Sequence, residues 1–563
     1  MTDQPDQPDQ PDAIDAIDAI DPIDPIDRQT SVLIVGAGPT GLMLALQLAR
    51  ANVPFVLIDA NVAPSITTKA LIVQARTMEI YQRSGVSAQA MAQVELVEAA
   101  TIHINGRTGV RLPLAQIGRG ISPFARPMAL TQDQNERILG DELRELGIRI
   151  HWLHKLVALN QTSDGVLATL QTGDNANDLT VTTQIAAQWV AGCDGAHSAV
   201  RHLCAIEFPG APYEQVFYVA DVHARGPATP GELHIYLWPD DFHFFFPMRS
   251  PAAGELRYRL IGIVPAMLRQ VDDLNFDDLR DAVHSRLAGA FTVTKVNWFS
   301  PYRIHHRRAS QFRSGRCFLL GDAAHIHSPA GGQGMNTGLQ DAFNLGWKLA
   351  LVCSGLANAA LLDSYASERI PVAQRLLQTT DQMFAAITST STVARVLRMH
   401  VALLAARTVL RLPAAQRLLF RTVSQTGIEY RASALSHNEG LLPKAAPHAG
   451  DRMPWLQLNF DKEEKASDLY QRMIGVGFHL ILWRQPAAAT QALADFAQRE
   501  HKLLTVLLIG DQAANETTLR TCGVRGPIAL LIRPDGHIAY AGSTLTVAGL
   551  ARYLQQRIGL TIT

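Results

Sequence analysis

Three glycines near the start of the chain have the spacing of a phosphate-binding turn. Gly36, Gly38 and Gly41 form a G-x-G-x-x-G pattern within VGAGPTG, and Pro39 lies inside the same turn. Gly36 permits a tight turn, Gly38 lets the backbone approach a pyrophosphate, and Gly41 lets a helix and a strand pack closely. The N-terminus of the following helix offers free N–H groups and the positive end of a dipole to phosphates. We therefore expect these residues to contact a dinucleotide.

The elements around this turn have the order that such a site requires. Residues 32–35 are predicted to form a strand, 42–50 an apolar helix and 55–58 a second strand that ends at Asp59. An acid at that position can accept hydrogen bonds from ribose hydroxyls. The alternative is a tight strand–helix turn in another type of α/β domain.

A second stretch, far downstream, carries complementary chemistry. A predicted strand over residues 317–320 ends in Gly321 and Asp322, and a glycine-rich loop leads into a helix from about Leu339. Asp322 can bond a polyol hydroxyl, and the bare N–H groups of the loop favour negative charge. This suits a reduced flavin, whose N1–C2=O edge is charged. The predicted cofactor contacts in this stretch are Asp322, Gly332, Gly334, Met335 and Asn336.

Three motifs together resemble a known family. GAGPTG with Asp59, CDGAHSAVR at 193–201 and GDAAH…PAGGQGMN at 321–336 resemble the fingerprints of single-component (class A) FAD-dependent aromatic hydroxylases, over residues 31 to about 435. Phenol, 3-(3-hydroxyphenyl)propionate and polyketide hydroxylases belong to this group. The resemblance implies bound FAD, NAD(P)H that docks without a second Rossmann domain, and O2 activated as a flavin C4a-hydroperoxide.

The resemblance also implies roles for individual residues. Lys69 and Arg76 would contact the FAD phosphates or ribose, although a solvated loop is the alternative there. Gln132 would contact the flavin, with Gln134 as the rival position. Asp194 would lie near both FAD and the nicotinamide path, or else serve only to hold strand to helix.

Residues 210–300 change in character. Strand-length runs such as FHFFFPM and LRYRLIGIV predict an antiparallel sheet with one covered face. Most of its aromatic residues can be explained by packing in the core. The more specific interpretation is that some of them line a substrate pocket on the flavin side of the sheet. The predicted pocket residues are Tyr236, Trp238, Phe244 and Phe246.

The candidates for chemistry beside the flavin come from the second stretch. Pro329 and the loop 331–336 would line the flavin face where oxygen reacts. His325 is a candidate proton carrier and is equally suited to a structural hydrogen bond. A base that deprotonates a phenol would assist the reaction, but the sequence does not identify it.

The remaining chain reads as helices followed by a third unit. Residues 339–435 are predicted to be helical, with a kink or break at Pro371 and an amphipathic helix over 393–412. After a Pro- and Gly-rich linker, strands are predicted over 478–483, 503–509, 528–533 and 537–541, and helices over 487–500 and 544–556. Pro534, Asp535 and Gly536 are expected to join the last two strands as a hairpin. The unit looks thioredoxin-like in this order. It lacks CxxC, and a single Cys522 excludes dithiol chemistry.

The fold class is therefore α/β: a Rossmann-like FAD-binding domain resembling para-hydroxybenzoate hydroxylase, an antiparallel-sheet substrate domain, a helical segment and a C-terminal thioredoxin-like domain. The predicted boundaries are a disordered acidic repeat tail (1–28), the first part of the FAD domain (29–205), the substrate sheet (206–305), the second FAD part with helices (306–440) and the thioredoxin-like domain (441–563).

Composition narrows the class of partner. The 563 residues carry a formal net charge of −1, which gives no electrostatic case for nucleic acid or an anionic membrane. Five scattered cysteines argue for a reducing compartment. Neither a signal peptide nor a membrane helix is expected, so we predict that the protein is cytoplasmic. We predict no metal site. The protein is expected to be a monomer or a homodimer.

The leading interpretation is an NAD(P)H-dependent FAD monooxygenase that hydroxylates a small phenolic or polycyclic aromatic substrate with O2. A Baeyer–Villiger or epoxidising enzyme on the same scaffold is one alternative, and a non-catalytic flavoprotein interaction module is another. NAD(P)H oxidation that rises with an aromatic compound and yields oxygenated product separates the enzymes from the binding module. The sequence leaves the substrate and the choice between NADH and NADPH open.

Overall fold

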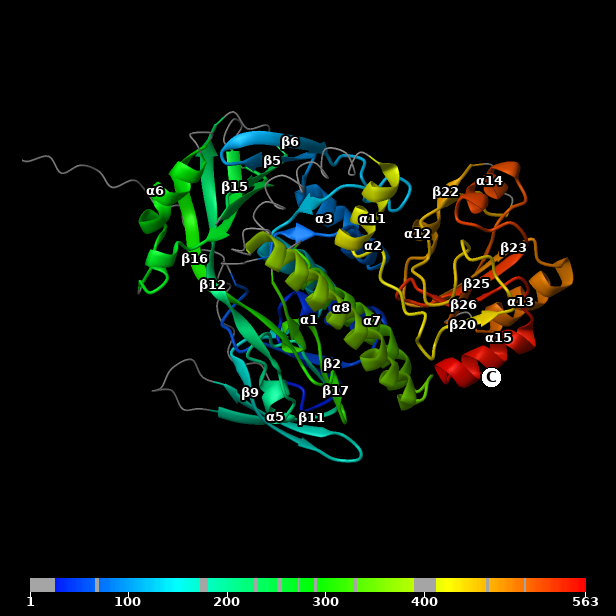
Figure 1. The fold of residues 1–563 in the computed structure, drawn as a ribbon. Helices are drawn as coiled ribbons and strands as arrows, with labels where there is room; N and C mark the ends of the chain where they lie inside the picture. Colours follow the sequence, from blue (N-terminus) through cyan, green and yellow to red (C-terminus); the bar gives the residue numbers. More distant parts are fainter. Residues whose placement is uncertain are drawn as a thin grey trace, which may run out of the picture.

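The structure is a computed structural model, and it describes residues 26–65, 70–172, 181–226, 231–239, 241–250, 256–271, 273–287, 291–328, 332–388, 412–461, 465–500 and 503–562. Several predicted features lie outside these residues: most of the acidic tail, Lys69, Pro329, Gly331 and nearly all of the helix expected over 393–412. Figure 1 shows three strand-rich units, with the C-terminal unit in orange and red on the right.

The first sheet carries the glycine turn. Its strands run in the order β17 (Arg313–Ser314), β18 (Cys317–Leu319), β11 (Val181–Gly192), β1 (Gln29–Val35), β2 (Phe55–Ile58) and β8 (Ile150–His151), while β10 (Val166–Thr172) and β9 (His154–Gln161) extend it from β11. The central strands are parallel. They carry unbroken apolar runs because both faces are covered; Val32, Leu33 and Ile34 are fully buried.

Helices cover this sheet and bring the two motif stretches together. α1 (Pro39–Arg50) packs against α4 (Gln132–Glu145) and α7 (Gly334–Cys353). Around them lie α2 (Ala75–Arg83), α3 (Ser87–Gln93), α5 (Ala199–Leu203) and a small sheet of β3 (Ile72–Val73), β7 (Met128–Ala129) and β4 (Glu95–Leu96).

The second sheet is the aromatic-rich unit. Its order is β19 (His325–Ile326), β16 (Thr292–Arg308), β12 (Gly210–Arg225), β15 (Leu256–Ile263), β14 (Phe242–Met248), β13 (Glu232–Leu237), β5 (Ala99–Ile104) and β6 (Arg107–Pro113). Neighbours are antiparallel except β13 and β5. α6 (Phe276–Arg286) covers one face. Residues 99–113, assigned by sequence to the FAD domain, join this sheet because β5 pairs with β13.

Two helix predictions differ from the structure. α7 begins at Gly334, five residues before the predicted Leu339, because side-chain hydrogen bonds of Asn336 hold its first turn in place. α8 (Asp363–Thr388), after the short turn η3 (Ala359–Leu362), continues through Pro371 without a break, and a kink at Pro371 stays a prediction. Proline removes one hydrogen bond and introduces a clash, but tertiary packing of a long helix can outweigh that cost.

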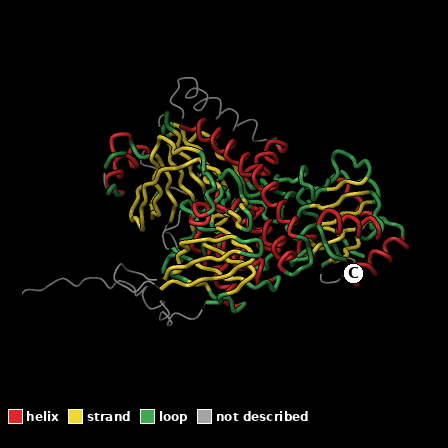
Figure 2. The backbone as a smooth tube through the Cα atoms, turned by 90° about the horizontal axis from the view of Figure 1, so that it is seen from below, coloured by secondary structure: helices red, strands yellow, loops and turns green. Residues whose placement is uncertain are grey.

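The C-terminal unit has the predicted strands and helices in order, with one further helix and one further edge strand. Its sheet runs β20 (His437–Glu439), β26 (Ile538–Gly542), β25 (Ile528–Ile532), β23 (Phe478–Trp483) and β24 (Leu504–Leu508), flanked by α13 (Ala487–Arg499), α14 (Ala513–Thr521) and α15 (Val547–Tyr553). The expected hairpin turn at Pro534–Gly536 is present. Figure 2 shows the strands of the three units as separate groups, with helices between the first sheet and the C-terminal unit.

Shorter elements complete the described chain: η1 (Ala266–Leu268), η2 (Gly321–Ala323), α11 (Pro413–Val423), β21 (Gln457–Leu458), β22 (Ser467–Asp468), α12 (Leu469–Arg472) and η6 (Leu554–Ile558). None of the helices in the described ranges combines the length and apolarity needed to span a bilayer.

Candidate functional site

The glycine turn leaves open space at one position only. Gly36 has φ +102°, and a Cβ on Gly36 or on Gly41 would clash with the backbone around it. A Cβ on Gly38 would meet no protein atom within 4 Å. Gly36 and Gly41 are thus required by packing, whereas at Gly38 the fold leaves room for a ligand. This is the division of roles that a pyrophosphate-binding turn needs.

The N-terminus of α1 faces this space. Gly38 is its N-cap residue, and no side chain caps the free N–H groups. Asp59, at the end of β2, accepts the Ala37 N–H at 2.7 Å through Oδ2, and its Oδ1 accepts from Asn61. The carboxylate is therefore fixed beside the turn, as expected of a ribose-binding acid.

The second motif stretch packs directly on the first. Gly321 has φ +57°, and a Cβ there would lie 2.7 Å from Thr40 Oγ1, in the first turn of α1. Asp322 follows at an exposed position. Thr40 is thus the point where the glycine turn meets the end of the strand that precedes Asp322. Nearly 300 residues separate these two segments in the sequence.

Asn336 holds the glycine-rich loop in place. Its Oδ1 accepts the Gln74 N–H at 2.8 Å and the Thr77 hydroxyl at 2.7 Å. Its Nδ2 donates to the carbonyls of Ile72 and Gly332, both at 2.8 Å. Because protein groups satisfy this buried amide, Asn336 positions the loop, and Gly332 and Gly334 offer only backbone to a ligand.

Met335, the neighbour of Asn336, has a half-buried side chain that packs against the core of the FAD-binding unit. Contacts of Gly332, Gly334 and Met335 with the flavin stay predictions.

The middle motif ties β11 to the strand end at Gly321. Asp194 Oδ2 accepts the Val200 N–H at 3.1 Å, and burial raises the pKa of Asp194. Asp194 Oδ1 is buried with no protein partner. The Arg201 guanidinium donates to the carbonyls of Ala196 at 2.8 Å and Ala323 at 3.0 Å. The motif thus has a structural role, and Asp194 retains one acceptor for a ligand.

His325 is held in a buried ionic cluster. Its Nε2 lies 2.8 Å from Asp341 Oδ2, which also accepts the Gly321 N–H at 3.0 Å. Arg369 donates to Asp341 Oδ1 at 2.6 Å. Burial alone would raise the pKa of Asp341, but Arg369 and His325 outweigh it and hold that pKa below its usual range. Of the two interpretations of His325, this geometry supports the structural one.

Sequence reasoning missed Asp341. A charged residue inside the apolar run of α7 was the available signal, because charged side chains are rarely fully buried without a partner.

The structure gives Arg76, a predicted FAD contact, other partners, and it separates Gln132 from its rival Gln134. The Arg76 guanidinium donates to Glu79 at 3.1 Å and to the Asp535 carbonyl at 2.6 Å, in the C-terminal unit. Arg76 is therefore not part of the cofactor site we propose. Gln134 caps α4 by accepting the Thr131 N–H at 3.0 Å, which leaves Gln132 as the position available to the flavin.

Gln132 contacts Glu136, a carboxylic acid with a raised pKa. Its Nε2 donates to Glu136 Oε1 at 2.9 Å. Burial raises the pKa of Glu136 to about 7, although the bond from Gln132 opposes the shift.

The aromatic residues of the second sheet divide between two faces. Phe217, Phe242, Phe244 and Phe246, here called the aromatic strip, succeed one another with ring centroids 6.2, 4.8 and 6.1 Å apart. Phe246 packs near Ile72, the residue that contacts Gly332 and bonds Asn336. The strip therefore lies on the face turned toward the glycine-rich loop.

Tyr236 and Trp238 lie on the other side of the sheet, so their assignment to the same pocket is corrected. Tyr236 pairs with His243 across β13 and β14 and packs, fully buried, with Phe245 in the core beneath α6. The Trp238 indole donates to the Arg286 carbonyl of α6 at 3.1 Å. Because side chains alternate along a strand, Phe244 and Phe246 face away from both.

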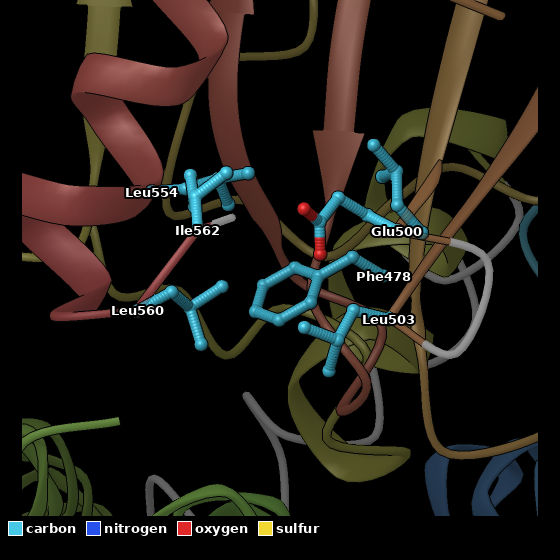
Figure 3. A pocket seen from close by; sticks show the side chains of 7 residues that line it. Phe478, Glu500, Leu503, Leu554, Leu560 and Ile562 are labelled. Atoms are coloured by element: carbon cyan, nitrogen blue, oxygen red, sulfur yellow. The ribbon is translucent and has the colours of Figure 1, made fainter. Parts of the chain in front are cut away.

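The cavity in the C-terminal unit is too small for a cofactor. It measures about 10 Å³ and is lined mainly by leucine, isoleucine and phenylalanine side chains, with Glu500 beside them (Figure 3). That is the volume of about one water molecule.

A glycine turn that leaves room at a helix N-terminus, with an acid fixed beside it, is the arrangement by which FAD-dependent oxidoreductases bind their dinucleotide. The chain matches the FAD binding domain family over residues 29–380 and the aromatic-ring hydroxylase C-terminal family over residues 446–560.

Individual relatives of known activity are monooxygenases of aromatic compounds. The chain is 32% identical to 6-methylpretetramide 4-monooxygenase of Streptomyces rimosus over 538 residues, 93% of each chain. It is 33% identical to pentachlorophenol 4-monooxygenase of Sphingobium chlorophenolicum over 435 residues, 76% of each. The solved OxyS anhydrotetracycline hydroxylase from Streptomyces rimosus is similar with a TM-score of 0.71 and 28% identity, covering 94% of this chain and 99% of that one.

The protein belongs to the family of FAD-dependent aromatic-ring hydroxylases. It is a monooxygenase of aromatic compounds with FAD as cofactor, and NAD(P)H is the usual reductant of this family.

Proposed function

We propose that the substrate is a fused-ring phenol of the polyketide type and that it lies along the aromatic strip. The observation that carries this proposal is the succession of Phe217, Phe242, Phe244 and Phe246 at 4.8–6.2 Å. Phe244 and Phe246 are half-buried and can stack on a ligand, while Phe217 and Phe242 are almost fully buried and extend the same apolar run. Such a run of rings matches several fused rings better than a single phenol ring. Relatives named for pretetramide and anhydrotetracycline oxidation support the same substrate class.

A buried cation ends the strip. Arg259 faces Phe246 and Asp221 across neighbouring strands, and its guanidinium lies 4.6 Å from the centre of the Trp298 ring. Burial lowers the pKa of Arg259 to about 10, so it stays charged at neutral pH. The Arg259 guanidinium also lies 3.8 Å from Asp221, which Arg257 pairs at 2.7 Å. Two cations and one anion leave a net positive charge, which favours a substrate with an enolate or phenolate at that end.

The cofactor site follows from the same geometry. We propose that the Gly36–Gly41 turn and the N-terminus of α1 hold the FAD pyrophosphate, with Asp59 on the ribose. Asp322, Gln132, Asp194 and the backbone of Gly332 and Gly334 hold the ribityl and flavin parts. When bound and reduced, FAD supplies the activation of O2. The chain's own part is to position the ring and to exclude water with the aromatic strip.

The wider organisation is proposed on the same basis. We propose that the chain has the five segments predicted from its sequence, except that residues 99–113 belong to the substrate sheet. A homodimer and a cytoplasmic location stay proposals, testable by light scattering and by cell fractionation.

A substrate panel tests the proposed function. Fused three- and four-ring phenols and single-ring phenols are compared as stimulators of NAD(P)H oxidation, with hydrogen peroxide measured to separate coupled from uncoupled turnover. We expect coupled oxidation with a fused-ring phenol. Coupled turnover with single-ring phenols alone would contradict the proposal.

A further inference from the structure

A buried ionic cluster joins the C-terminal unit to α7 and α8. Arg533 donates to both Glu368 oxygens at 2.6 and 2.9 Å, and Lys348 donates to Glu368 at 2.8 Å. Arg533 also bonds Asp535 of the hairpin turn. All four side chains are almost fully buried, and two cations face two anions. Such a cluster fixes geometry more than it adds stability, because desolvation offsets the attraction.

A second line of contacts leads from the same unit to the cofactor loop, defined as residues 321–325. Tyr430 hydroxyl accepts from Arg369 Nη1 at 2.9 Å, and Arg369 Nε donates to Asp341 at 2.6 Å. Asp341 in turn accepts from the Gly321 backbone and from His325, at opposite ends of the loop. Only two side chains therefore separate Tyr430 from the backbone beside Asp322.

The C-terminal unit holds Tyr430 from three sides. Its N–H donates to the Gly450 carbonyl at 2.7 Å, and Gly450 itself bonds Ile538 of β26. Its ring packs on His537 with centroids 4.3 Å apart. The Arg533 guanidinium lies 5.2 Å from the same ring. The position of the Tyr430 hydroxyl thus follows the position of the C-terminal unit.

We propose that the C-terminal unit is a positioning element of the FAD site, acting through Tyr430, Arg369 and Asp341 on the cofactor loop. This assigns to the unit a function that needs no thiol chemistry. Tyr430 is a positioning residue, since it acts on FAD only through other side chains. The inference rests on the proposed placement of FAD against Gly321 and Asp322.

The test compares two tyrosine-to-phenylalanine variants. Tyr430→Phe removes the hydroxyl that receives Arg369. Tyr553→Phe is the matched control, because Tyr553 is equally buried and donates one bond, at 2.6 Å, to the Leu435 carbonyl. Each variant is measured for thermal unfolding, for FAD affinity by titration of the apoprotein, and for the midpoint potential of the bound flavin.

We expect Tyr430→Phe to weaken FAD affinity by about 3- to 10-fold, since a bond to a charged group is lost, and to shift the flavin potential. Tyr553→Phe should bind FAD within about twofold of wild type. Equal FAD affinity and equal potential in the two variants would overturn the proposal.

Asp341→Asn supplies a second comparison, because Asp341 is the residue that bonds both Arg369 and the cofactor loop. This variant should bind FAD more weakly than Tyr430→Phe does. Wild-type activity on a fused-ring phenol is measured separately, so failure of the substrate assignment and failure of this inference are distinguishable.

Discussion

Asn336 Oδ1 accepts the Gln74 backbone N–H at 2.8 Å, although the two residues are 262 positions apart. Through its Nδ2 the same amide bonds the Ile72 carbonyl, so one side chain fastens the start of α7 to β3. Ile72 packs near Phe246. The loop proposed to receive the flavin and the strip proposed to receive the substrate are therefore positioned by one set of contacts.

Gly38→Val should empty the cofactor site without unfolding the protein. A Cβ at Gly38 meets no protein atom within 4 Å, and its φ of −73° suits any residue. We expect FAD content below about a tenth of wild type, because the pyrophosphate can no longer approach the backbone.

Gly140→Val in α4 is the control, since a Cβ there also meets nothing within 4 Å. It should keep full FAD content. Full occupancy in Gly38→Val, measured by flavin absorbance per protein, would refute the assignment of the turn.

Phe244→Ala and Phe245→Ala should fail in different ways. Phe244 belongs to the aromatic strip, so its loss should raise KM for a fused-ring substrate about tenfold with little change in Tm. Phe245 is fully buried and stacks on Phe291 at 5.2 Å, so its loss should cost about 3–5 kcal/mol of unfolding free energy.

Steady-state kinetics and calorimetry on both variants check this contrast. A larger KM effect at Phe245 than at Phe244 would place the substrate on the other face of the sheet.

Glu136→Gln should change how stability depends on pH. The pKa of Glu136 is raised by burial to about 7, so the folded state retains a proton that the unfolded state has lost above its usual value of 4.5. Native stability therefore falls as pH rises from about 4.5 to 7, and the glutamine variant avoids this loss.

We expect the variant to be more stable than wild type by about 1–2 kcal/mol at pH 8, after allowance for solvent screening, and similar to it at pH 4.5. Urea unfolding at the two pH values measures the difference. A stability difference independent of pH would show that Glu136 ionises normally.

Cys522→Ser should leave turnover within about twofold of wild type. One thiol cannot cycle as a dithiol. The Cys522 Sγ donates to the Leu519 carbonyl at 3.1 Å, a bond that serine can replace. A large fall in turnover with FAD content and Tm preserved would reopen a redox role for the C-terminal unit.

The sequence was sufficient for elements whose pattern is local. The strand, glycine turn, helix, strand and acid from Val32 to Asp59 were predicted within a few residues, because apolar runs and glycine spacing are read along the chain. The hairpin around Pro534–Gly536 was predicted for the same reason.

Some side-chain positions depend on pairing between distant segments. The sequence predicts Tyr236 in one pocket with Phe244, but the register that pairs Tyr236 with His243 places it on the α6 side. It predicts Arg76 at FAD, whereas in the structure the Arg76 guanidinium bonds Glu79 and the Asp535 carbonyl, 459 residues away. Neither register nor such a partner is encoded in local spacing.

Isotope labelling tests the central claim most directly. Purified enzyme with FAD is given NAD(P)H, ¹⁸O2 and a fused-ring phenol, and the product is analysed by mass spectrometry. An aromatic-ring hydroxylase must place one labelled oxygen atom on a ring carbon, with one NAD(P)H oxidised per product. Product carrying oxygen from water, or NAD(P)H oxidation that yields only hydrogen peroxide with every aromatic compound tested, would contradict the account.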